Sequence, residues 1–223
     1  AARGCHDVAV AQLVPFVSGK DSMFNDFKGF DDDGQPKMVS ALPTLLISAL
    51  SVLPEWRRAV SMDFKAPGDA IYWVGPEPEE ALARSELALA LSLDDDALES
   101  PAAKGDFDYA GFEAATAKGL VASAQASGWG GAAAALARSA MAGGLAANVK
   151  ADWSTAQWFT ESAGGLLVTT ADADAGAFEA TVGSARRIGT VTDTDTLSMD
   201  GEAVSLAALL EAYRSEESGE INR

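Results

Sequence analysis

The sequence is poor in cysteine and histidine, and this shortage excludes several kinds of site. Its 223 residues include one cysteine, Cys5, and one histidine, His6. A single cysteine excludes an internal disulfide, and these two residues are too few for a zinc site built by the chain itself. As neighbours on a helix they would point about 100° apart, so an ordinary helical position is favoured over a nucleophile and its base. Any metal is therefore expected to be a hard cation.

Basic residues are also scarce. The chain has 16 Lys and Arg against 33 Asp and Glu, which gives a formal net charge of −17. A groove for nucleic acid needs clustered Lys and Arg to meet the phosphates, so we expect no nucleic-acid partner. The acids are spread along the chain, at residues 31–33 and 94–96 for example, and this spacing favours a solvated surface.

Long apolar runs are absent as well. The run at residues 45–53 is interrupted by Ser48 and Ser51, stops at Pro54, and is much shorter than the roughly 20 residues of a membrane span. Residues 1–7 hold an acid and no apolar stretch, which is unlike a signal peptide. We therefore expect no membrane segment and a cytoplasmic location.

Hydrophobic residues make up 48% of the chain, which is enough to build a core. Their spacing predicts a fold of the α+β class, in which helices and strands alternate around a mixed sheet in two layers. We expect helices at residues 1–13, 81–93, 109–120, 130–142, 178–185 and 206–213. We expect strands at residues 15–17, 42–53, 70–74, 165–170 and 187–192.

The predicted elements divide the chain near residues 59–63. The first helix has no initiating cap and no preceding strand, so the chain is expected to begin inside a domain. Residues 1–62 are predicted to be part of one domain, and residues 63–223 a second domain.

Three blocks of sequence carry a resemblance to a known family. They are VPFVSGKDSMFNDF at residues 14–27, PTLLISA at 43–49 and RRAVSMDFKAPGD at 57–69. In this order and spacing they resemble the second synthetase half of the formylglycinamide ribonucleotide amidotransferases, which belong to a superfamily with aminoimidazole ribonucleotide synthetase. Weaker similarity continues to residue 191. The resemblance implies the end of a synthetase N-terminal-type domain at residues 1–62 and a synthetase C-terminal-type domain at residues 63–223.

The resemblance also implies a reaction and partners. This family uses ATP to convert formylglycinamide ribonucleotide to the amidine with ammonia from glutamine, in purine biosynthesis, and magnesium stabilises the phosphoryl oxygens. The implied partners are an amino-terminal synthetase half and a glutaminase domain or subunit. In the family's pattern Gly19 matches a nucleotide-contacting glycine and Ser22 a substrate-contacting serine. Lys20 stands where many members have a magnesium-binding asparagine; an ammonium cannot ligate a cation but can meet a phosphate.

An ordinary strand-to-turn link, with Asp21 or Ser22 capping a helix, is the structural alternative for this loop.

The sequence departs from the family at residues 123–131. Where the family has His-Asp-x-Ser-Asp-Gly-Gly, Gln125 replaces the histidine, Ala126 and Trp129 replace the two acids, Gly128 replaces the serine, and only the paired glycines remain. Trp129 either stands beside the nucleotide position or packs into the core. The departure implies that this half has lost its oxygen ligands for magnesium and is mainly architectural.

Two further interpretations remain open for the chain as a whole. One is a non-catalytic assembly module of the same superfamily that has lost nucleotide binding. The other is a self-sufficient kinase of the superfamily, which the missing His-Asp motif disfavours. No catalytic residue or metal ligand is predicted, and the chain alone is expected to be inactive.

Overall fold

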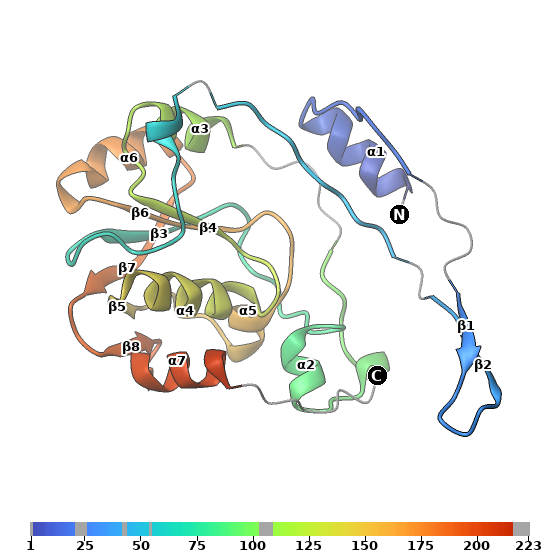
Figure 1. Cartoon of the computed structure of the whole chain (residues 1–223). Coiled ribbons are helices and arrows are strands. Elements are labelled where there is room, and N and C mark those ends of the chain that lie inside the picture. The colour runs from blue at the N-terminus through green and yellow to red at the C-terminus, as the bar shows by residue number, and fades with distance from the viewer. Residues whose placement is uncertain (1, 21–25, 42–43, 54, 103–108, 216–223) are drawn as a thin grey trace. The chain divides into compact units, whose positions relative to one another are not determined.

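The computed structural model describes residues 2–20, 26–41, 44–53, 55–102 and 109–215 (Figure 1). The chain divides into two compact units, residues 1–54 and residues 55–223. Within the described residues, no helix is both long and apolar enough to cross a bilayer. The predicted domain boundary near residues 59–63 stays a prediction.

The described residues of the first unit contain one helix and one hairpin. Helix α1 runs over Ala2–Ala11, and strands β1 (Phe27–Phe30) and β2 (Pro36–Val39) pair antiparallel. The turn between the strands is closed by the Asp31 carboxylate, which accepts the N–H groups of Asp33 at 3.1 Å and Gln35 at 2.8 Å. Such local side-chain bonding is typical of aspartate in turns.

The predicted first helix is confirmed, but the two strands predicted beside it are not present in the described residues. Residues 15–17 and 44–53 form neither helix nor strand. Their apolar side chains are exposed, and Leu50 reaches 92%. A strand needs a neighbour to pair its N–H and C=O groups, and β-rich composition alone does not supply one.

The second unit is built on a sheet of seven strands with the order β4-β6-β3-β7-β5-β8-β9. Its strands are β3 (Ala70–Val74), β4 (Ser123–Ala126), β5 (Ala146–Val149), β6 (Leu166–Thr170), β7 (Arg186–Thr192), β8 (Thr196–Met199) and β9 (Glu202–Ser205). Its helices are α2 (Glu86–Ala90), α3 (Ala110–Ala117), α4 (Gly131–Gly143), α5 (Thr155–Phe159), α6 (Ala175–Val182) and α7 (Leu206–Arg214). Three short 3₁₀ turns lie at Trp56–Arg58, Asp95–Ala97 and Asp172–Asp174.

The predicted α+β class with a mixed sheet is confirmed. Strands β5 and β8 pair in parallel, with Asn148 opposite Ser198. The other strand pairs of this sheet are antiparallel. The strands predicted at residues 70–74, 165–170 and 187–192 correspond to β3, β6 and β7.

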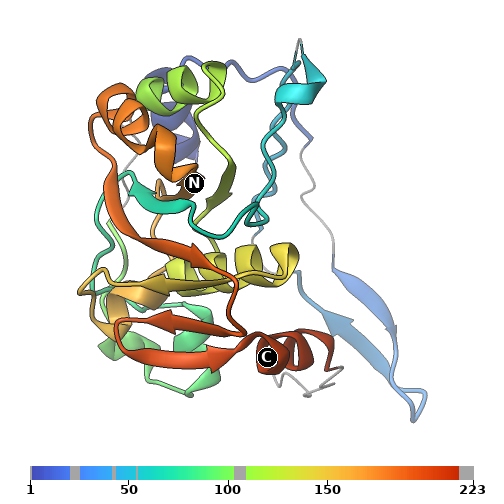
Figure 2. The same ribbon diagram turned by 90° about the vertical axis from the view of Figure 1, so that its left-hand side faces the viewer.

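Helices cover both faces of the sheet, whereas the sequence analysis predicted a fold of only two layers. Every residue of β3 is buried. Ile71 and Trp73 pack into a cluster with α4, α5 and α7, while Tyr72 packs with α3 and α6 on the opposite face. Figures 1 and 2 show these helices on the two sides of the sheet. A central strand buried on both faces requires a cover on each side.

Two predicted helices differ most from the observed bounds. The helix expected at residues 81–93 is reduced to α2, because Arg84 (φ +61°) and Ser92 (φ +51°) adopt left-handed backbone conformations on either side of it. Left-handed residues interrupt a right-handed helix. Helix α6 begins three residues earlier than expected and ends at Val182, just before Gly183, whose φ is +72°.

One acid at the start of β3 is buried without full compensation. Asp69 is 6% exposed, and its Oδ2 atom has no hydrogen-bond partner in the described part of the chain. Burial raises the pKa of Asp69 above its ordinary value, and a smaller opposing effect comes from the Ala66 backbone. An ionised carboxylate here therefore costs stability.

Replacing this acid should stabilise the protein at neutral pH. Because the folded-state pKa of Asp69 is raised, protonation favours the fold, and this contribution is lost as the pH rises through the unfolded and then the folded pKa. We expect Asp69→Asn to raise the free energy of unfolding by about 1 kcal/mol at pH 7 and by less at pH 4. Urea unfolding at both pH values measures this, with exposed Asp193→Asn as the control. A gain that is equal at both pH values would contradict the assignment.

Candidate functional site

The loop predicted to meet nucleotide is only partly described. Gly19 and Lys20 lie in an exposed segment between α1 and β1, and Ser22 lies outside the described residues. A Cβ atom added to Gly19 would meet no heavy atom within 4 Å, so packing within the chain does not demand glycine there. The nucleotide and substrate roles of Gly19, Lys20 and Ser22 stay predictions.

The altered family motif forms the turn between β4, at the edge of the sheet, and helix α4. Gly130 (φ +79°) and Gly131 (φ +66°) both adopt left-handed conformations. A Cβ atom on Gly131 would lie 2.6 Å from the Trp158 carbonyl oxygen. Only glycine fits this approach, so the paired glycines serve to open α4 against its neighbours.

Ala126 and Trp129, which the sequence analysis matched to the family's acids, are both exposed. Trp129 is 74% exposed, which excludes the alternative that its indole packs into the core. Ala126 is also exposed at the end of β4. The Trp129 carbonyl oxygen accepts a hydrogen bond from Arg138 Nη2 at 3.0 Å, which fixes the backbone of the turn. Neither side chain offers an oxygen to a cation.

The carboxylate of Glu161 accepts backbone N–H groups at this turn. Glu161 Oε1 accepts the N–H of Gly130 at 2.9 Å and the N–H of Glu86 at 2.7 Å. It thereby joins the starts of α2 and α4. An anion arriving at the same N–H groups would have to displace this carboxylate. The sequence places Glu161 in a block similar to the family, but gives no sign of these contacts.

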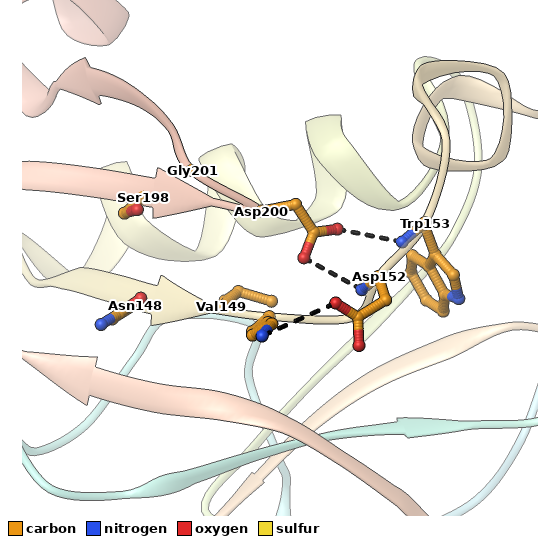
Figure 3. A pocket seen from close by; sticks show the side chains of 8 residues that line it. Asn148, Val149, Asp152, Trp153, Ser198, Asp200 and Gly201 are labelled. Atoms are coloured by element: carbon orange, nitrogen blue, oxygen red, sulfur yellow. Dashed lines mark hydrogen bonds and ion pairs between the residues drawn. The ribbon is translucent and has the colours of Figure 1, made fainter.

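A second place of interest is a cavity of about 560 Å³ at the carboxyl ends of the parallel strands β5 and β8 (Figure 3). Polar side chains from both strands and from the connections that follow them line it. They include Asn148, Lys150, Asp152, Ser198 and Asp200. The sequence analysis did not find this site, because its residues meet only through the parallel pairing.

Asp200 organises one side of the cavity. Its Oδ1 accepts the N–H groups of Ala151 at 2.9 Å and Asp152 at 3.0 Å. Its Oδ2 accepts the Trp153 N–H at 3.1 Å and the Trp158 indole N–H at 2.8 Å. Burial acts to raise the pKa of Asp200, but these hydrogen bonds together hold the pKa below its ordinary value.

The wall behind Asp200 is aromatic and rigid. The Trp153 ring lies between the rings of Trp73 and Trp158, with centroid distances of 5.2 Å and 4.7 Å. Glu77 accepts hydrogen bonds from the Trp153 indole N–H and from Arg186 Nη1, each at 2.8 Å. Edge-to-face packing and these hydrogen bonds hold the aromatic wall of the cavity in place.

Across the described residues, no three His, Cys, Asp or Glu side chains come together in a group that could hold a metal ion. Asp152 and Asp200 therefore make no cation site by themselves. The carboxylate of Asp200 is directed to N–H groups of the chain (Figure 3).

Comparison with known families identifies the second unit. The model of the family described as "AIR synthase related protein, C-terminal domain" matches residues 66–202, well over half of the chain. The chain belongs to the AIR synthase related family. The match begins just before β3 and ends at the start of β9, so it contains both the altered turn and the cavity.

Two curated relatives of this AIR synthase related chain are PurL subunits. The phosphoribosylformylglycinamidine synthase subunit PurL of Erythrobacter litoralis is 34% identical over 96% of the chain, and that of Zymomonas mobilis 31% over 96%. The chain spans 30% of the length of each. The resemblance to the amidotransferases is thereby confirmed.

Solved structures agree on the fold. Thermotoga maritima PurL complexed with FGAR superposes with a TM-score of 0.63 at 16% identity, over 91% of this chain and 36% of that one. The same protein complexed with ATP gives 0.51 at 17% identity, over 69% and 27%. At these identities the likeness concerns the fold.

The hydrogen bonds of Asp200 predict a loss of stability on substitution. We expect Asp200→Asn to lower the free energy of unfolding by about 2 kcal/mol at pH 7, because an amide nitrogen cannot accept the N–H groups that Oδ2 now accepts. Since the folded-state pKa is lowered, the contribution of the carboxylate is present above the unfolded pKa and lost as the pH falls through the folded pKa. Thermal melts at pH 7 and pH 3 measure both effects.

The matched control is Asp152→Asn, since Asp152 is next to the same contacts and its side chain is 75% exposed. Equal melting temperatures for the two variants at pH 7 would show that the carboxylate of Asp200 does not hold the turn.

Proposed function

We propose that this chain is part of a phosphoribosylformylglycinamidine synthase, contributing a largely architectural half of its synthetase region. The observation that carries the proposal is the 34% identity to a PurL subunit over 96% of the chain. In this proposal residues 63–223 are the synthetase C-terminal-type domain and residues 1–62 the end of the N-terminal-type domain. The enzyme would work in the cytoplasm.

The proposed reaction is the ATP-dependent conversion of formylglycinamide ribonucleotide to the amidine. Magnesium and ATP would act where another synthetase half supplies the acids, and a glutaminase domain or subunit would supply ammonia. Within this chain, Gly19 and Lys20 are the proposed nucleotide contacts and Ser22 the proposed substrate contact. Lys20 would meet a phosphate oxygen as an ammonium.

Three features of the altered turn support an architectural role. The side chains at positions 126 and 129 offer no oxygen, although both are exposed and accessible to a ligand. Glu161 already accepts the Gly130 N–H. The glycines are retained where packing requires them. In this proposal the turn has lost its chemistry but keeps the glycines that the fold requires.

The same contact of Glu161 favours a second candidate, a non-catalytic assembly module without nucleotide binding. Calorimetric titration of the chain, assembled with its synthetase and glutaminase partners, with ADP and magnesium separates the two proposals. The other synthetase half is expected to bind nucleotide itself, so the informative signal is any additional binding. If that additional binding weakens with Gly19→Val or Lys20→Met, the result supports the amidotransferase half with a nucleotide contact. Binding that is unchanged by both variants supports the assembly module.

We expect the purified chain alone to have no amidotransferase activity. The catalytic histidine and glutaminase cysteine of the family have no counterpart in it, and positions 126 and 129 carry no acid. Incubation with formylglycinamide ribonucleotide, ATP, magnesium and ammonia should release no ADP above background. As a positive control, the amino-terminal synthetase half is added to the same mixture, to show that the assay can detect ADP release. Turnover by the chain alone would refute the proposed division of labour.

Restoring acids at the altered turn should strengthen binding of magnesium nucleotide there. Ala126→Asp with Trp129→Asp supplies two carboxylate ligands, the type that magnesium prefers. Since both positions are exposed, we expect the melting temperature to change little, by the equivalent of about 0.5 kcal/mol or less. Calorimetry with ADP and magnesium on the assembled enzyme measures the gain.

The matched control is Ala126→Asn with Trp129→Asn, which has the same shapes without the charges. A gain in both double variants would assign the effect to removal of the indole. An unchanged affinity in the acidic variant would show that this turn does not lie beside nucleotide phosphate.

A further inference from the structure

The cavity between β5 and β8 contains polar groups that the chain leaves without partners. Asn148 and Ser198 lie opposite each other on the parallel ladder, and both side chains line the cavity (Figure 3). Neither side chain makes a hydrogen bond within the described part of the chain. The carboxyl ends of parallel strands are a common place for ligands in α/β sheets, and the volume of about 560 Å³ is in the usual range for a small-molecule site.

Two opposite charges stand at the same cavity. Lys150 Nζ and Asp152 Oδ1 are 3.9 Å apart, and their side chains are 80% and 75% exposed. An exposed pair at this separation is weakly held, so a ligand can separate it at little cost. Asp200 is already engaged with four donors of the chain and has little capacity left for a ligand.

We propose that this cavity binds a small zwitterion, specifically a free α-amino acid. The ligand's ammonium would meet the Asp152 carboxylate and the Asn148 amide oxygen, while its carboxylate would meet the Lys150 ammonium and the Ser198 hydroxyl. Each polar group of the cavity then gains a partner of the complementary kind. The inference does not depend on the proposed function.

The charges of the cavity disfavour other ligands of similar size. One lysine stands beside two carboxylates, Asp152 and Asp200, so a phosphate or nucleotide would meet net negative charge. A neutral sugar could accept and donate hydrogen bonds but would not use the pair of opposite charges. Only a zwitterion offers both charges without adding net charge.

The test is a titration followed by amide NMR on the whole chain. L-Glutamine is the probe, with acetate, methylammonium, ribose and inorganic phosphate compared at equal ionic strength. We expect saturable shifts of the Asn148, Asp152, Ser198 and Gly201 amides with L-glutamine, at a Kd of roughly 1–10 mM. The absence of saturable shifts up to about fivefold above that range, or equal shifts with acetate, methylammonium, ribose or phosphate, would overturn the proposal.

Substitutions at the two charges provide the second part of the test. Lys150→Met and Asp152→Asn should each weaken L-glutamine binding about fivefold, the effect of one exposed ion pair. The matched control is the exposed pair of Arg187 and Asp172, which are 2.8 Å apart and do not line the cavity. Arg187→Met and Asp172→Asn should leave the affinity unchanged. An equal loss in the control variants, or no loss in the cavity variants, would contradict the assignment, and thermal melts confirm that all four variants are folded.

Discussion

Burial of β3 on both faces is the constraint on which the second unit depends. Alternate residues of this strand point into two separate cores, so helices are needed on each side of the sheet. The ring centroids of Tyr72 and Phe178 are 4.9 Å apart on one face, and those of Trp73 and Trp153 are 5.2 Å apart on the other. Loss of the helices on either face would expose a large aromatic surface. Strand β3 therefore couples the two layers of helices.

Close approach of backbone segments is the second organising feature, and glycine makes it possible. At Gly131 a side chain would collide with backbone at the end of α5, and at Gly143 with the backbone of Phe64. Both glycines lie in α4, whose buried face is otherwise mostly alanine. These contacts give the glycines of the turn a packing role that does not depend on any acid beside them.

The sequence predicted those elements that carry their own signal. Strands β3, β6 and β7 are short β-rich runs, and α4 begins and ends at glycine pairs. Strands were predicted at residues 15–17 and 42–53, but residues 15–17 and 44–53 form none, because apolar composition does not reveal whether a pairing partner exists. Residues 42 and 43 lie outside the described residues. Left-handed residues such as Arg84 also shortened a helix that had good periodicity.

The candidate sites likewise divide into features with a local sequence signal and features that depend on contacts distant in the sequence. The departure from the family at Ala126 and Trp129 can be found by reading along the chain. The contact of Glu161 with Gly130 joins residues 31 positions apart. The cavity of Asn148 and Ser198 likewise exists only because β5 and β8 pair in parallel. Such sites depend on topology, which local sequence patterns do not specify.

The strong acidity of the chain does not by itself supply a magnesium site at the turn that carries Ala126 and Trp129. Magnesium requires oxygen ligands at about 2.0–2.1 Å in near-octahedral arrangement, so acids that are dispersed over a surface do not replace a pair on one turn. The excess of 17 negative charges instead raises the cost of bringing nucleotide phosphate to this chain. A phosphate site would need either local cations, such as Lys20, or a metal held by ligands from outside the chain. This requirement links the architectural role proposed for the chain to its charge as well as to its altered turn.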